Sequence, residues 1–225
     1  MAEFQTLTTR GVAEEVYDIL RDKILSCELA PGQRLDVAQI SIQLSVSRTP
    51  VKDALQRLSV QDLVEIHPRR GTFVSKITPE DVRETFEVRE ALEVKACDLA
   101  AGKLKPETIE KLRGLNQRMF APDLRFGDHV VLDSELHRTI IESAGNQRLL
   151  KMYSELKAHV QIARVHYRST NWRTHNKTTA SEHLSVIDAL SEGRGEDARG
   201  AMQTHIRNSM QRLISGVLHP SVDSA

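Results

Sequence analysis

Cysteine and aromatic residues are scarce in this sequence, and long apolar runs are missing. Cys27 and Cys97 stand far apart, in neither a metal-binding nor a redox spacing. This argues against a disulfide framework and fits a reducing cytoplasm. No run of about 18 apolar residues occurs, and the first residues lack a basic segment followed by an apolar one. We therefore expect neither a membrane span nor a secretion signal.

An excess of charge of one sign is also missing. The 31 basic and 31 acidic residues balance, so any binding of nucleic acid must come from a local patch. Hydrophobic residues make up 40% and charged residues 28% of the 225 positions, which is typical of a globular protein. A chain of this length can form two domains, each with its own core.

The first third of the chain has the pattern of two short helices around a tight turn. Apolar residues recur at helical spacing from Val12 to Leu25, and two further helices are expected at 37–44 and 50–58. Ser47 can cap the last of these. This arrangement indicates a helix-turn-helix.

A small β-hairpin is expected directly after these helices. Residues 63–67 and 72–74 have strand patterns on either side of a turn at 68–71. A hairpin in this place is commonly a wing that contacts DNA, although a plain surface hairpin has the same pattern. The N-terminal part is therefore expected to be a winged helix-turn-helix.

The rest of the chain has helical patterns only. Thr78 is the expected N-cap and Pro79 the first helical residue, which gives a DNA-binding domain at 1–77 and an all-α domain at 78–225. The expected helices are 79–101, 106–119, 128–143, 147–168, 179–192 and 196–216, with a loop at 168–177. The predicted protein is mainly α, with a C-terminal bundle of six or seven helices.

Cations line one face of the second helix of the expected helix-turn-helix. Arg48, near its start, can make a bidentate contact with a guanine edge, whereas Lys52 is more suited to a phosphate. Six cations and three anions lie between residues 48 and 76. This excess supports DNA binding only modestly, since a solvated charged helix face has the same composition.

Four residues on three of the expected C-terminal helices have the chemistry of a metal site. The i,i+4 spacing places Asp133 and His137 on one helix face, while His183 and His205 are flanked by apolar residues on two other helices. Each feature alone has an ordinary alternative, a surface pair or a satisfied core histidine, and His129 competes on the face of Asp133. Together they suit zinc, nickel, manganese or iron with an open position.

Such a metal could also activate water, so a metal-dependent hydrolase is the alternative function. The sequence contains no HExxH motif, nucleophile elbow or phosphate-binding glycine loop. Glu135 is the nearest carboxylate, but its i+2 offset from Asp133 turns it away. We therefore expect the chain not to be an enzyme.

The strings LAPGQRLDVAQISIQLSVSRTPVKDALQRL and LVEIHPRRGTFV resemble the winged helix-turn-helix of the GntR family, over roughly residues 10–76. The resemblance implies a transcription regulator that binds double-stranded operator DNA. The implied DNA-binding residues are Arg34, Arg48, Thr49, Lys52, Arg57, Arg70 and Gly71. Ser45 and Asp62 depart from the family pattern, because glycine is usual there, and Lys52 stands where arginine is usual.

The strings FEVREALEVKACDLA, DSELHRTIIESAGNQRLL and SEHLSVIDALSEGRGEDARGAMQTHI resemble the FCD ligand-binding domain of the FadR subfamily, and six helices are closer to its VanR-like branch. The resemblance implies a homodimer, a small carboxylate effector and a divalent metal, zinc first. The implied metal ligands are Asp133, His137, His183 and His205. Arg89 could meet the effector carboxylate, or simply pair with Glu93 four residues later.

Overall fold

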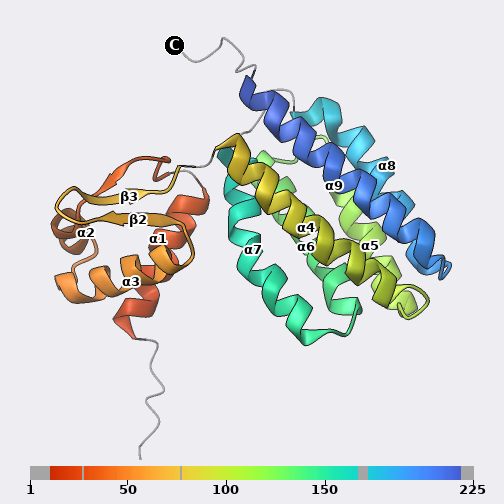
Figure 1. Ribbon diagram of the computed structural model, residues 1–225, viewed down its shortest axis with the longest axis horizontal. Helices are drawn as coiled ribbons and strands as arrows, with labels where there is room; N and C mark the ends of the chain where they lie inside the picture. Colours follow the sequence, from red (N-terminus) through yellow and green to blue (C-terminus); the bar gives the residue numbers. More distant parts are fainter. Residues whose placement is uncertain (1–10, 27, 77, 167–171, 219–225) are drawn as a thin grey trace, which may run out of the picture. The chain divides into compact units, whose positions relative to one another are not determined.

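The computed structural model describes residues 11–26, 28–76, 78–166 and 172–218 (Figure 1). The chain divides into two compact units, residues 1–76 and 77–225. Cys97 is a buried free thiol, whereas Cys27 lies outside the described residues. No helix among the described residues combines the length and the apolar character that crossing a membrane requires.

The first unit packs three helices on a small antiparallel sheet (Figure 1). The helices are α1 (Val12–Leu25), α2 (Val37–Gln43) and α3 (Arg48–Val60), and the strands are β1 (Arg34–Leu35), β2 (Val64–His67) and β3 (Gly71–Val74). The strand order is β1-β3-β2, with His67 opposite Gly71 in the hairpin. The expected winged helix-turn-helix is present. β1 was not predicted, because a strand of two residues has no alternation to detect.

The apolar stripes of α1 and α3 form the core of this unit. Leu20 and Ile24 of α1 and Leu55 and Leu58 of α3 are all buried, as their helical spacing predicted. α3 begins two residues earlier than expected, so Pro50 lies in its first turn, where a backbone N–H has no helical partner to lose.

Ser47 occupies the N-cap position of α3, but its side chain makes no capping hydrogen bond. Ser47 therefore occupies the predicted cap position but does not form the capping hydrogen bond. Ser45, in the turn between α2 and α3, has a φ of 54°, and Asp62, after α3, has a φ of 52°. Both positions are thus in the left-handed region that favours glycine, which is the residue that the GntR pattern has there.

The second unit is a bundle of helices (Figure 1). Its described helices are α4 (Pro79–Ala100), α5 (Pro106–Arg118), α6 (Phe126–Ser143), α7 (Gln147–His166), α8 (Trp172–Ser191) and α9 (Gly195–Leu218). α9 packs along both α4 and α8. Thr78 caps α4 as predicted and forms a capping box with Asp81. The described bundle therefore has the smaller of the two expected numbers of helices.

The expected loop at 168–177 is wrong from residue 172 onward. α8 begins at Trp172, whereas residues 167–171 lie outside the described part of the chain. The first two turns of α8, WRTHNKT, have no apolar stripe, so the sequence pattern could not reveal them. Arg173 attaches this end to the chain before α6, because its guanidinium donates to the backbone carbonyl of Leu124 (2.8 Å).

Candidate metal centre

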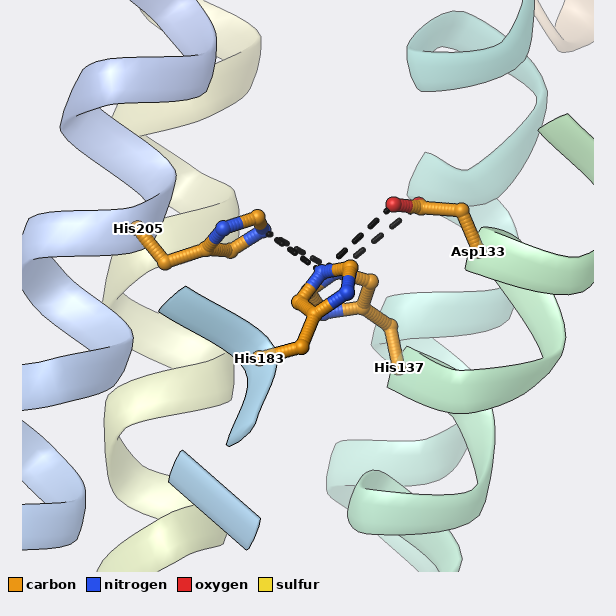
Figure 2. Close-up of side chains that lie close together, drawn as sticks. All are labelled: Asp133, His137, His183 and His205. Carbon is orange, nitrogen blue, oxygen red and sulfur yellow. Dashed lines mark hydrogen bonds and ion pairs between the residues drawn. The ribbon is translucent and has the colours of Figure 1, made fainter. Parts of the chain in front are cut away.

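Four side chains from three helices meet inside the second unit (Figure 2). α6 supplies Asp133 and His137 one turn apart, α8 supplies His183, and α9 supplies His205. All four are buried, and one ligand atom of each lies within 4.8 Å of the others. The described residues contain no other such group of histidine, cysteine or carboxylate side chains.

The distances between the ligand atoms fit a single ion. His205 Nε2 lies 3.2 Å from His137 Nε2 and 3.3 Å from His183 Nε2. The carboxylate of Asp133 lies 3.7 Å from His137 Nε2 and 3.6 Å from His183 Nε2. Nitrogen and oxygen ligands bound at about 2.0–2.2 Å in tetrahedral geometry are separated by roughly 3.3–3.5 Å. The four residues are therefore spaced as ligands of one metal.

Each histidine uses its other ring nitrogen to contact a polar side chain. His137 Nδ1 contacts Glu93 of α4, His205 Nδ1 contacts Glu182 of α8 (2.9 Å), and His183 Nδ1 contacts Asn116 of α5 (3.3 Å). An ionised carboxylate only accepts hydrogen bonds, so the Nδ1 atoms of His137 and His205 donate. Their Nε2 atoms then present lone pairs to one another. A cation between them satisfies both, as in metal sites whose histidines donate to an outer carboxylate.

The electrostatics of the site favour a neutral His205 and an ionised Glu93. Burial lowers the pKa of His205 to about 4, although the bond to Glu182 works against this. Burial acts to raise the pKa of Glu93, but Arg89 and His137 outweigh it and hold that pKa at about 2. Neutral imidazole is the form that binds a metal, so the donor set fits a divalent ion.

Arg89 of α4 lies in the same buried region. Its Nε donates to Glu93 Oε1 (2.5 Å), and its guanidinium carbon lies 5.1 Å from the centre of the Phe86 ring. It also interacts electrostatically with Asp133. Its Nη1 has no hydrogen-bond partner among the described residues. Arg89 thus pairs with Glu93 and still has a buried N–H group free for an acceptor.

The structure separates the ligands from the competing side chains. His129 is only partly buried and does not join the group. Glu135 is half-exposed and pairs with Lys111 of α5 (3.1 Å), so it points away as predicted. Sequence reasoning missed Asn116 and Glu182 as partners of the histidines, and it considered Glu93 only as a partner of Arg89. Contacts between helices far apart in sequence create these roles.

The predicted DNA-binding residues lie on the exposed surface of the first unit. Apart from Gly71, which has no side chain, each of these residues is exposed. Arg34 and Arg48 both act electrostatically on Asp36, which caps α2, so β1 and the start of α3 contribute to one surface. Gly71 has a φ of 117°, and a Cβ there would come 3.1 Å from Arg34 Nε. The wing-tip glycine thus makes room for Arg34.

Arg57 has different surroundings from the other predicted DNA-binding residues. Its two Nη atoms donate to Glu14 of α1 (2.8 and 3.3 Å), and its guanidinium carbon lies 4.1 Å from the centre of the Tyr17 ring. Arg57 therefore connects α3 to α1 within the unit.

Comparison with known proteins assigns both units. The profile of the bacterial regulatory proteins of the gntR family matches residues 12–74, and that of the FCD domain matches residues 84–208, more than half of the chain. The chain belongs to the GntR family and carries an FCD domain. This family consists of regulators with a DNA-binding helix-turn-helix, so the chain is a transcriptional regulator and the alternative of a hydrolase is dropped.

Relatives and solved structures agree with this assignment. A regulator in an unstable DNA locus of Streptomyces ambofaciens is 31% identical over 92% of this chain and 86% of its own length. The repressor RspR of Escherichia coli K12 is 30% identical over 91% and 90%. The structure of E. coli McbR/YncC has a TM-score of 0.78 at 19% identity, over 93% of this chain and 100% of that one. This last likeness shows the fold.

Proposed function

We propose that this GntR-family regulator is a cytoplasmic homodimeric repressor whose operator binding is controlled by a divalent metal and a small carboxylate. The observation that carries the proposal is the buried set of Asp133, His137, His183 and His205 beside Arg89, whose Nη1 has no partner among the described residues. Buried ligand atoms and a buried free donor in one place are typical of a binding site.

Asp133 and the three histidines would hold the ion, and zinc suits three imidazoles and one carboxylate best, ahead of nickel, manganese or iron. When bound, the ion supplies a positive centre with a position open to a carboxylate oxygen. Arg89 would orient the same carboxylate through Nη1, because guanidinium groups bind carboxylates in a fixed geometry.

We propose that some of the DNA-binding residues contact a base edge and that others contact phosphates. Arg48 reads a guanine edge from the start of α3, while Thr49 and Lys52 bind phosphates. Arg34, Arg70 and Gly71 contact the minor groove and its phosphates from the sheet and wing. Arg57 contributes least, since Glu14 and Tyr17 already hold its guanidinium.

One small winged helix buries limited DNA surface, so two copies on a pseudo-palindromic operator are expected. The effector can change operator affinity only by binding one arrangement of the dimer more tightly than another. The repressor assignment draws support from RspR, which is named a repressor.

Fluorescence anisotropy with DNA from the region upstream of the gene tests the proposal. A panel of small carboxylates should change the affinity of the zinc-loaded chain for this DNA, and a chelator should abolish the response. A response of equal size in the presence of chelator would contradict the role of the metal.

Sedimentation should give a dimer at micromolar concentration, and a monomer that binds one half-site tightly would contradict the dimer.

A further inference from the structure

The turn that joins β2 to β3 (Figure 1) holds an arginine in a backbone conformation that is uncommon for arginine. Arg69 has a φ of 66°, in the left-handed region that favours glycine. The backbone N–H of Arg70 donates to the carbonyl of His67 (3.2 Å), which closes a turn with Pro68 second and Arg69 third. This is the order of a type II turn, whose third residue is usually glycine. The wing therefore keeps a long cationic side chain at a strained position.

The local backbone does not explain this strain. Among the described residues, the only others with a side chain and a positive φ are Ser45 and Asp62. Both have short polar side chains, which can hydrogen-bond to the nearby backbone, and aspartate is enriched in this conformation. Arg69 has no such short polar group. Strained residues of this kind gather at functional sites, so the side chain of Arg69 is expected to have a function that glycine could not supply.

Arg69 is also a cation without a partner in the part of the chain that the structure describes. It is exposed and makes no hydrogen bond or ion pair there. Arg57 of the same unit, by contrast, donates to Glu14 (2.8 Å). Glu65, the acidic residue of β2, contacts His67 instead (2.8 Å). The guanidinium of Arg69 is therefore available to a partner outside the chain.

The shape of the wing determines which part of DNA its tip can enter. A two-stranded ribbon fits the major groove, about 12 Å wide, but not the minor groove of about 6 Å. Only the side chains of the turn can therefore enter the minor groove. Phosphates line the outside of the groove, where a long, flexible cation reaches them from an unstrained backbone. A fixed cation at the tip is needed only for a target inside the groove.

An A·T-rich minor groove is the target that fits this side chain. Such a groove is narrow, which strengthens its negative potential, and arginine suits it because a guanidinium is less strongly hydrated than an ammonium group. A G·C pair adds the 2-amino group of guanine to the minor groove. This group takes up space and is itself a donor, so it opposes a guanidinium.

We propose that Arg69 inserts its guanidinium into a narrow, A·T-rich minor groove beside each half-site, and that it gives the regulator a preference for this flanking sequence. The inference rests on the proposed function, because it needs α3 in the adjacent major groove. Arg69 reads the shape of the groove, whereas Arg48 reads a base edge. The wing keeps a strained residue here because glycine, the unstrained choice, has no side chain to insert.

Inosine separates a reading of the minor groove from a reading of the major groove. An I·C pair resembles A·T in the minor groove, since inosine lacks the 2-amino group, but it resembles G·C in the major groove. Hydroxyl-radical footprinting of a duplex from the region upstream of the gene first locates the positions that wild type protects and Arg69→Gly does not. A footprint without such positions would overturn the proposal.

The located A·T pairs are then replaced, and the affinity of the full chain is measured by fluorescence anisotropy. Replacement by G·C should weaken binding of the wild type about tenfold, while replacement by I·C should change it by less than about twofold. Equal losses for I·C and G·C would show that these pairs are read in the major groove and would overturn the proposal.

Two substitutions test the residue itself. Arg69→Gly relieves the backbone and removes the side chain, so it should melt at an equal or higher temperature and yet bind the A·T-flanked duplex about tenfold more weakly. Arg69→Lys keeps the charge, so its affinity for random DNA and its salt slope should stay, while its preference for A·T over G·C should be lost. A lower melting temperature of Arg69→Gly with equal losses on both duplexes would mean a supporting role and would overturn the inference.

Arg70→Ala is the matched comparison, because Arg70 lies in the same turn without a positive φ. It should weaken binding to A·T- and G·C-flanked duplexes by the same factor. Loss of the A·T preference in Arg70→Ala and its retention in Arg69→Gly would overturn the inference. Wild-type operator affinity in Arg48→Ala and Lys52→Ala would overturn the proposed DNA surface itself. If those two lose affinity and Arg69→Gly keeps the preference, only this inference fails.

Discussion

Arg89 with Glu93 in the second unit and Arg57 with Glu14 in the first unit are pairs of the same chemistry in opposite surroundings. The side chains of the first pair are 1% and 0% exposed, and those of the second are 44% and 42% exposed. Water screens the exposed pair and can solvate either partner alone. Water cannot take the place of a lost partner in the buried pair, so removing one partner leaves the charge of the other without solvation in the interior.

The predicted DNA-binding residues and the candidate metal ligands differ in exposure in the same way. The predicted DNA-binding side chains are exposed, which lets them reach phosphates and bases but fixes them little. The candidate metal ligands are buried, and the three histidines are each held by a further side chain. Substitutions in the second unit should therefore have large effects on stability or metal binding, while those in the first should have smaller ones.

The largest loss of stability is expected for Arg89→Ala. It leaves Glu93 buried without its cation, so the free energy of unfolding of metal-free protein should fall by about 3–5 kcal/mol. Urea denaturation followed by circular dichroism measures this. A loss below about 1 kcal/mol, the range of exposed pairs, would erase the contrast between the two units.

Arg48→Ala should have an intermediate effect, on DNA binding alone. The loss of a bidentate base contact should cost about 1–3 kcal/mol at the operator and relax the base preference there. Lys52→Ala should weaken binding to all DNA similarly and lower the salt slope by about one. Titrations on operator and random DNA at several salt concentrations separate the two, and equal losses on both DNAs for both variants would contradict the assignment.

Arg57→Ala should have a smaller effect than either of these. An exposed ion pair contributes about 0.2–1 kcal/mol and a cation–π contact at an exposed site about 0.5–1 kcal/mol. We therefore expect a stability loss of about 1 kcal/mol and a change in operator affinity smaller than that of Arg48→Ala. A stability loss as large as that of Arg89→Ala would show that exposure does not distinguish the pairs.

The smallest effect is an expected gain. Ser45→Gly and Asp62→Gly relieve a left-handed backbone at residues with a side chain, and part of this gain is offset because glycine makes the unfolded chain more flexible. Each variant should be more stable by a few tenths to about 1 kcal/mol. Differential scanning calorimetry measures the shift, and a lower melting temperature in both would contradict the strain.

Local patterns predicted what depends on residues close in sequence. The helix-turn-helix, the hairpin, the Thr78 cap and the shared face of Asp133 and His137 all follow from spacing and turn chemistry. β1 exists only because β3 pairs with it, and the first turns of α8 have no apolar stripe. Such features depend on tertiary contacts, which spacing does not reveal.

The partners of the histidines show the same limit at the candidate site. Asn116 and Glu182 are ordinary polar residues in the sequence, and only the packing of α5, α8 and α9 brings them to His183 and His205. The resemblance to the FCD domain favoured Asp133, His137, His183 and His205, which the residue patterns had already suggested as a possible metal site, over the ordinary alternatives for each of them. The i,i+4 spacing indicated Asp133 and His137, with His129 as a rival, and the apolar neighbours of His183 and His205 indicated that these two face inward.

Metal content per chain tests the central claim most directly. Elemental analysis of purified, folded protein should find about one divalent metal per chain in wild type and in His129→Ala, and little in His183→Ala or His205→Ala. His129 is the matched control, since it lies on α6 four residues before Asp133 but outside the group. Loss of the metal in His129→Ala together with its retention in His183→Ala would contradict the account of the site.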